Sequence, residues 1–163
     1  MDEPAPYLLI LWHSRTGAAQ AMARAAADGA GGDVRLLRAG DARSRDLLAA
    51  AGFLFVCPEN LGSMTGEMKE LFDRCYYPLL GRIEGRAYAT FIAAGSDGAV
   101  AQAQIDRIVT GWRLRRVADP VIVNLAAQTP DAILAPKHVP AAELERCREV
   151  GAALAEGIRL GIF

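Results

Sequence analysis

Three segments of the chain are apolar at almost every position, which is the pattern of strands that are buried on both faces. They are residues 7–12, 53–57 and 87–94. Each has the length of a strand and shows little alternation between apolar and polar residues. Strands of a parallel sheet that helices cover on both sides have this composition. The pattern therefore predicts a sheet buried between two helical layers.

Two weaker segments have the features of strands at a sheet edge. Residues 34–38 include two arginines, and residues 117–124 include Pro120. Edge strands tolerate charge, and proline cannot donate a hydrogen bond to a neighbouring strand. We therefore place these two segments at the edges of the sheet and the three apolar strands inside it.

Apolar residues at helical spacing fill the gaps between the strands. Around residues 68–75, 105–112 and 144–158 they recur three and four positions apart. Residues 17–30 are so rich in alanine that helix propensity, rather than spacing, predicts a helix there. Two stretches contain the turn-forming residues typical of extended loops, "GDARSRD" (40–46) and "AAQTPDAILAPKHVP" (126–140).

Strand and helix thus alternate five times along the chain, which predicts a doubly wound α/β fold. With the edge strands assigned above, the strand order is 2-1-3-4-5 in a five-stranded parallel sheet. We expect the 163 residues to form a single three-layer α/β/α domain. Such sheets bind ligands beyond the carboxyl ends of their strands, where the winding reverses.

Composition narrows the functional classes. The formal net charge of −1 provides no field that would attract nucleic acid or an anionic membrane. Cys57, Cys75 and Cys147 stand far apart in apolar surroundings, so we expect reduced core thiols in a cytoplasmic protein. The acidic start "MDEPAP" does not resemble a signal peptide. A chain of this length needs no metal or disulfide to build a core.

The corner "HSRTGA" (13–18) is the first of three candidate ligand loops. It joins a buried strand to a helix N-terminus, where unpaired N–H groups and the helix dipole favour an anion. Ser14 and Thr16 add hydroxyl groups, and Gly17 allows close approach of the backbone, so a phosphate site is predicted. Arg15 can point toward the phosphate or away from it. The alternative is that Thr16 only caps the helix.

The second loop, "PENLGSM" (58–64), follows the next buried strand. Pro58 is expected to end that strand, and residues 60–62 can form a tight turn. Such a loop offers backbone N–H and C=O groups to the edge of a flat heterocycle. Alternatively it is a plain connection to a helix that Thr65 caps, with Glu67 in the first turn.

The third loop, "AAGSDGA" (93–99), follows the last buried strand. Its glycines flank Ser96 and Asp97, and the alternative here is that Asp97 caps the following helix. Three polar, glycine-bearing loops at adjacent strand ends are harder to explain as independent caps. Dinucleotide and Walker fingerprints are both absent from the sequence.

"HSRTGAAQAMA" and "PENLGSMTGEMKELFDRCY" resemble the phosphate loop and the second loop of flavodoxin-like FMN-binding proteins, a family that includes flavodoxins and NAD(P)H-dependent FMN or quinone reductases. The resemblance implies that FMN binds at all three loops. The implied residues are Ser14, Arg15, Thr16, Gly17, Ala18 and Ala19 around the phosphate; Pro58, Glu59, Asn60, Leu61 and Gly62 along the isoalloxazine ring; and Gly95, Ser96 and Asp97 on the opposite side of the ring or along the ribityl chain.

Two departures from the family pattern affect flavin binding. Many relatives have a hydroxyl residue where this chain has Ala19, and the ring loops contain no aromatic residue, with Leu61 where some relatives have Phe. Both changes predict weaker retention of FMN.

The resemblance implies a redox protein in which the flavin carries the chemistry. NAD(P)H is the expected reductant, and a small molecule is the expected electron acceptor. No side chain is assigned as an acid, base or nucleophile, and His13 and His138 stand alone in the sequence. The alternatives are an electron-carrier flavodoxin and a flavodoxin-like scaffold that has lost FMN. A phosphate-accepting receiver domain lacks support, because the third strand ends without the aspartate that such domains need.

One stretch of the sequence has the composition of a subunit interface. The stretch "CYYPLLG" (75–81) places tyrosines and leucines at the end of the third helix, which we expect near the ring loop. Aromatic clusters suit interfaces, although packing within one subunit explains them equally well. The resemblance implies a homodimer or homotetramer.

Overall fold

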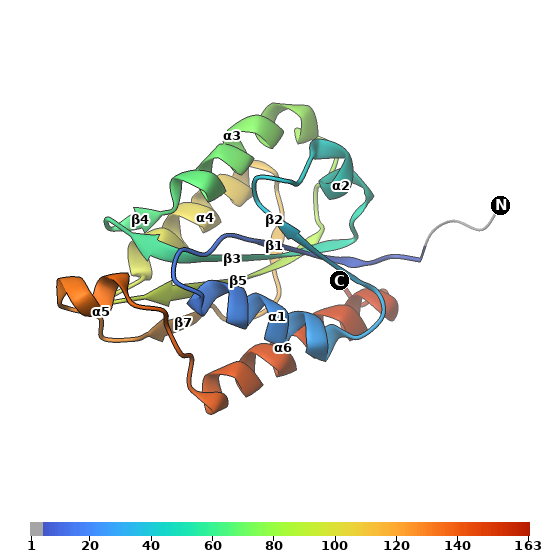
Figure 1. Cartoon of the computed structure of the whole chain (residues 1–163). Helices are drawn as coiled ribbons and strands as arrows, with labels where there is room; N and C mark the ends of the chain where they lie inside the picture. The colour runs from blue at the N-terminus through green and yellow to red at the C-terminus, as the bar shows by residue number, and fades with distance from the viewer. Residues whose placement is uncertain (1–4) are drawn as a thin grey trace.

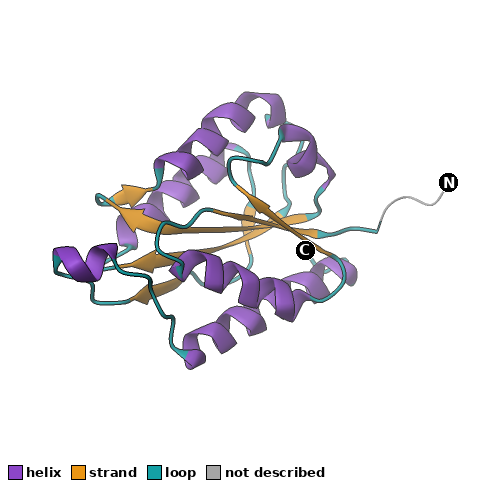
Figure 2. Cartoon of the chain, in the orientation of Figure 1, coloured by secondary structure: helices purple, strands orange, loops and turns teal. Residues whose placement is uncertain are grey.

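A twisted parallel sheet forms the middle layer of the computed structural model, which describes residues 5–163 (Figures 1 and 2). The strand order is β2-β1-β3-β5-β6, and β7 also pairs with β5. The strands are β1 (Leu8–Trp12), β2 (Val34–Arg38), β3 (Gly52–Asn60), β5 (Ala87–Ala94), β6 (Arg115–Arg116) and β7 (Val121–Asn124). With β6 and β7 as the two pieces of the fifth strand, the predicted order 2-1-3-4-5 is confirmed.

Helices cover both faces of the sheet (Figure 1). On one face lie α1 (Ala18–Ala30) and α6 (Ala141–Arg159); on the other lie α2 (Ser44–Ala49), α3 (Gly66–Leu79) and α4 (Ala99–Gly111). Each face has its own apolar core. Phe53 and Phe55 of β3 pack toward α3, whereas Leu54 and Val56 pack toward α1, so the central strand is buried on both faces up to Cys57.

Two predicted loops contain short helices. Helix α2 begins within 40–46, and α5 (Pro130–Leu134) lies within 126–140. Both are stabilised by caps: the N–H of Arg43 donates to Asp46 Oδ2 at 2.7 Å, and Thr129 Oγ1 accepts from the N–H of Ala132 at 3.2 Å. Helices of five or six residues are too short to show a 3.6-residue apolar period, so the sequence pattern did not reveal them.

The predicted fifth strand, 117–124, is divided. Its first piece lies earlier than expected, at Arg115–Arg116 beside the start of β5, and its second begins after Pro120 and pairs with the end of β5. The proline interrupts the ladder, as its missing N–H requires.

No helix within residues 5–163 combines the length and the apolar character needed to cross a membrane.

Candidate functional site

The three predicted loops meet at the carboxyl edge of the sheet, because β1, β3 and β5 are neighbours there. Side chains join them directly. The Asn60 amide, in the orientation that satisfies both its ends, accepts from Arg15 Nε at 3.1 Å. Glu59 Oε1 accepts from the N–H of Gly98 at 2.9 Å. The first loop therefore contacts the second, and the second contacts the third.

The first loop leaves the N-terminus of α1 open. Gly17 is the N-cap residue, with φ 100° and ψ −17°, and no side chain caps the helix. Thr16 is therefore not the cap, which corrects that alternative. Among the residues described, the N–H groups of Arg15, Thr16, Ala18 and Ala19 have no hydrogen-bond acceptor. The first turn also contains no acidic residue. This combination leaves several aligned donors available to an anion.

The residues of the first loop differ in which of their groups can contact a ligand. Ser14 Oγ accepts from the N–H of Gly17 at 3.1 Å, so it shapes the loop and still has its own proton to donate. Ala18 and Ala19 are buried in the core against β1, so only their backbone can contact a ligand. A Cβ at Gly17 would meet nothing within 4 Å. The glycine is thus required by its positive φ, and the space beside it is open.

Other helices at this edge have their N-termini filled by the protein itself. In α3, Thr65 Oγ1 accepts from the N–H of Met68 at 3.4 Å, which confirms Thr65 as the cap. In α4, Glu59 Oε2 accepts from the N–H of Ala101 at 3.1 Å, in addition to its bond with Gly98. The contrast with α1 indicates that the open donors there are available for a ligand.

The second loop is a β-hairpin. The strand β3 continues past Pro58 to Asn60 and pairs antiparallel with β4 (Ser63–Met64), so the expectation that Pro58 ends the strand is wrong. The tight turn is confirmed: Leu61 and Gly62 both have positive φ, at 55° and 69°. Two such residues define the turn that suits a two-residue hairpin. The Leu61 side chain is fully exposed.

The third loop is held by the last residue of β7 and by the segment that follows this strand. Gln128 Nε2 donates to the carbonyl of Gly95 at 2.7 Å, and Asn124 Nδ2 donates to the carbonyl of Ser96 at 2.6 Å. Asp97 Oδ1 accepts from the N–H of Ala99 at 3.2 Å, so its predicted capping role is present in part. Neither Asn124 nor Gln128 was predicted as a site residue. The signal that could have indicated them was an amide side chain at the end of a strand and a second one shortly after it.

His13 is also part of this edge and is not isolated. Its ring is 4% exposed, with Nδ1 2.9 Å from Thr65 Oγ1 and Nε2 3.1 Å from Glu67 Oε2. Burial lowers the pKa of His13; Glu67 opposes this, and the nearby cations of Arg38 and Arg15 reinforce it. The residue joins the first loop to the start of α3 as a neutral side chain at neutral pH. The sequence signal that could have indicated this role is the position of His13 between a buried strand and a polar loop.

Cys57 offers no nucleophile beside the hairpin. It is buried, and that burial raises the pKa of its thiol to about 12. The thiolate form that reacts is therefore absent at neutral pH.

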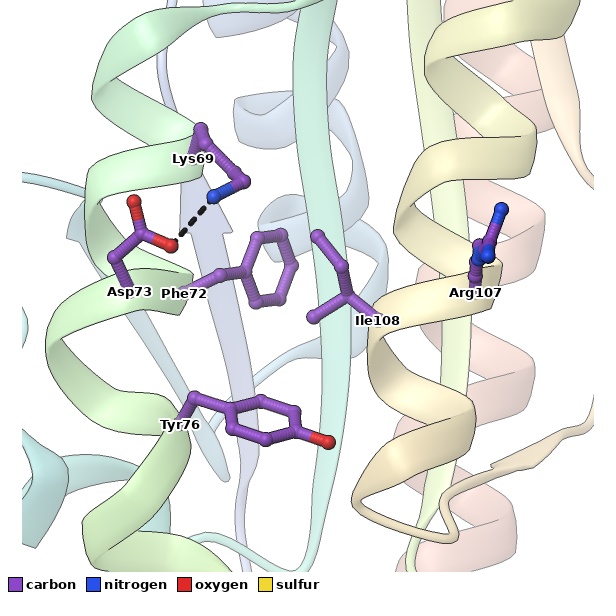
Figure 3. A pocket seen from close by; sticks show the side chains of 6 residues that line it. All are labelled: Lys69, Phe72, Asp73, Tyr76, Arg107 and Ile108. Atoms are coloured by element: carbon purple, nitrogen blue, oxygen red, sulfur yellow. Dashed lines mark hydrogen bonds and ion pairs between the residues drawn. The ribbon is translucent and has the colours of Figure 1, made fainter.

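A groove of about 290 Å³ lies elsewhere, between α3 and α4 (Figure 3). It is lined by Lys69, Phe72, Asp73, Tyr76, Arg107 and Ile108. None of these belongs to the three loops. The C-terminal end of α3, with its tyrosines, lies at the opposite end of the helix from the hairpin, so the expectation that it is near the ring loop is wrong (Figure 1).

The residues of the three loops fit FMN. The open donors of α1 suit a phosphate, and the adjoining hairpin and third loop present backbone groups from two strands beside it. The position of Ala19 offers no hydroxyl, as expected from the sequence.

Comparisons with known proteins point to the same cofactor. The family model described as NADPH-dependent FMN reductase matches residues 39–128, more than half of the chain, including the second and third loops. A protein named flavodoxin from Aquifex aeolicus is 30% identical over 162 residues, covering 94% of this chain and 87% of that protein.

Solved structures show the same fold. A flavodoxin from the domain Archaea superposes with a TM-score of 0.74 at 17% identity, covering 94% of this chain and 99% of that one. A WrbA-like flavodoxin protein from Agrobacterium tumefaciens superposes with a TM-score of 0.71 at 19% identity, covering 96% and 99%. The match to the family model and the 30% identity to the Aquifex aeolicus flavodoxin show that the chain belongs to the flavodoxin-like family of FMN-binding proteins.

Proposed function

We propose that this protein is an NAD(P)H-dependent FMN or quinone reductase. Overall, NAD(P)H and a proton convert a quinone to a hydroquinone, leaving NAD(P)⁺. Bound FMN would supply the two-electron carrier for this reaction. The protein's own residues would bind and orient the cofactor: the first loop its phosphate, and the hairpin and third loop its ring.

The observation that carries this proposal is the hairpin. It is short, its tip residue Leu61 points into solvent, and no aromatic side chain stands in 58–62 or 95–97. An aromatic residue stacked on the ring would compete with a nicotinamide or a quinone for the same flat face. An uncovered face suits a protein whose substrates must stack there. The description of the matching family model supports the same reading.

An electron carrier without a substrate of its own is the second candidate, because the Aquifex aeolicus relative is named flavodoxin. A carrier docks on a redox partner, and strong charge complementarity speeds that docking. With a net charge of −1, this chain would be attracted only weakly to a charged redox partner, which favours the reductase over the carrier.

The test is a titration of the purified protein with FMN, followed by addition of NADH or NADPH with a quinone. Flavin binding with steady turnover supports the reductase. Flavin binding without turnover, but with rapid electron exchange with a redox protein, supports the carrier. Absence of flavin binding would overturn both functions.

The variant Thr16→Ala checks where the phosphate binds. Each hydrogen bond to a charged oxygen contributes about 1.5–3 kcal/mol, so the Kd for FMN should rise roughly tenfold or more. Because Thr16 does not cap α1, the midpoint of thermal unfolding without FMN should not change. Thr110→Ala, an exposed threonine of α4, is the matched control. Equal losses of stability and affinity would contradict the assignment.

A further inference from the structure

The segment 125–137 forms an arch over the carboxyl edge of the sheet. At one end, the N–H of Leu125 donates to the carbonyl of Ala94 at 2.7 Å, beside the Gln128 bond to the third loop. At the other end, the N–H of Lys137 donates to the carbonyl of Thr16 at 2.8 Å. The arch therefore extends from the third loop to the phosphate loop and borders the candidate flavin site.

Helix α5, in the middle of this arch, is ordered by polar bonds rather than by a core. It has no buried residue. Thr129 caps its start, and Lys137 Nζ donates to the carbonyls of Ile133 and Ala135 at its end. Its two large apolar side chains are in solvent, with Ile133 53% and Leu134 77% exposed. A short helix that is fixed in place yet exposes its apolar residues has them available for a ligand.

A third exposed apolar side chain belongs to the hairpin, which is the second loop of the candidate site. Leu61 is 104% exposed at the tip of the hairpin, and Figure 1 shows the hairpin with β4 and helix α5 at the same end of the molecule. Its φ of 55° belongs to a turn position where asparagine and glycine are favoured. A leucine here is unfavourable for the turn and buries nothing, so folding does not explain it.

We propose that Ile133 and Leu134, with Leu61 opposite, bind the hydrocarbon substituent of an alkyl quinone while its ring lies at the flavin site. This inference rests on the proposed function. Three aliphatic side chains cover far less than the roughly 800 Å² per partner of a stable protein interface. The chain also lacks the net charge that would steer a protein partner. A small apolar molecule fits both facts.

Direct binding is measured by methyl NMR of the FMN-loaded protein titrated with a decyl-substituted benzoquinone and with unsubstituted benzoquinone. The decyl compound should shift the methyl signals of Ile133, Leu134 and Leu61. Leu160 and Ile162, which are 54% and 65% exposed near the C-terminus, are the matched controls and should not shift. Equal shifts in both groups, or none in either, would overturn the subsite.

Kinetics then compare Ile133→Ser/Leu134→Ser with the control Leu160→Ser/Ile162→Ser. The ratio of kcat/KM for the decyl quinone to that for the unsubstituted quinone should fall at least fivefold in Ile133→Ser/Leu134→Ser. The same ratio should not change in the control variant. An unchanged preference in the first variant overturns the proposal. If the first variant instead loses sedimentation with lipid vesicles while quinone preference is unaffected, the surface binds a membrane and the proposal also fails.

A separate measurement distinguishes this subsite from the reductase function. Protein reduced with dithionite is re-oxidised by each quinone without any NAD(P)H. Preference for the decyl quinone in this assay, without NAD(P)H turnover, would retain the subsite and remove the reductase. Turnover with NAD(P)H but equal rates for both quinones would do the reverse.

Discussion

Glu59 shows how a single side chain organises the ligand edge. Its two carboxylate oxygens accept from the N–H groups of Gly98 and Ala101, so a residue of the hairpin caps a helix that begins 40 positions later in the chain, at Ala99. The negative charge also lies at the positive end of the α4 dipole. The hairpin and the third loop are therefore positioned as one unit.

Replacing Glu59 with Gln should destabilise this unit. The amide has one acceptor oxygen and no charge, so the free energy of unfolding should fall by about 1–2 kcal/mol, the usual value of a helix cap. Urea unfolding measures it. Glu84→Gln, at an exposed position between α3 and β5, is the control. Loss of equal size in the control would contradict the capping role.

His13 predicts a pH dependence of stability. Because its folded-state pKa is lowered, the unfolded chain binds the proton more readily below about pH 6.5. The stability associated with the neutral ring is therefore complete above pH 6.5 and decreases as the pH falls below it. His13→Gln should flatten the unfolding free energy between pH 7 and pH 5, relative to the parent protein. His138→Gln, at an exposed position, should leave the parent profile unchanged.

At the scale of elements, glycines bring α1 and α6 together. A Cβ on Gly29 would lie 2.1 Å from the carbonyl oxygen of Arg148, and a Cβ on Gly151 would lie 2.1 Å from that of Ala26. The backbones of the two helices are thus in direct contact. This packing positions α1, whose N-terminus follows the first loop of the candidate site, against the sheet.

Gly151→Ala should force the helices apart. The clash is with backbone, which cannot rotate away, so we expect a loss of about 1–3 kcal/mol, the usual cost of overpacking. Thermal and urea unfolding measure it. Gly32→Ala, where an added Cβ meets nothing within 4 Å, is the control and should change stability little. A neutral Gly151→Ala would show that α1 and α6 separate at no cost.

For the whole molecule, phosphate binding should appear as ligand-induced stability. At 100 times its Kd, a ligand that binds only the folded state adds about 2.7 kcal/mol, which is several degrees of Tm for a domain of this size. FMN at that concentration should raise the Tm by several degrees. Riboflavin, which lacks the phosphate, should raise it much less at the same concentration. Equal Tm shifts with FMN and riboflavin would show that the phosphate contributes nothing to binding.

The sequence by itself determined the sheet and the places of its loops. Buried strands are local patterns of apolar residues, and Pro120 and the strand arginines indicated the edges, so the strand order followed from composition and handedness. The turn at Leu61–Gly62 and the Thr65 cap were also readable, because turn and cap chemistry depend on a few adjacent residues.

Only the tertiary structure decided which polar groups remain free. Glu59 accepts from N–H groups at the start of α4, whereas no side chain of residues 5–163 caps the start of α1. The local sequences of the two helix starts do not show this difference. Arg86 is a second case: from far along the chain it donates to the carbonyls of Leu47, Leu48 and Ala50 at the end of α2. Contacts between distant residues depend on how the layers pack, and no local pattern records them.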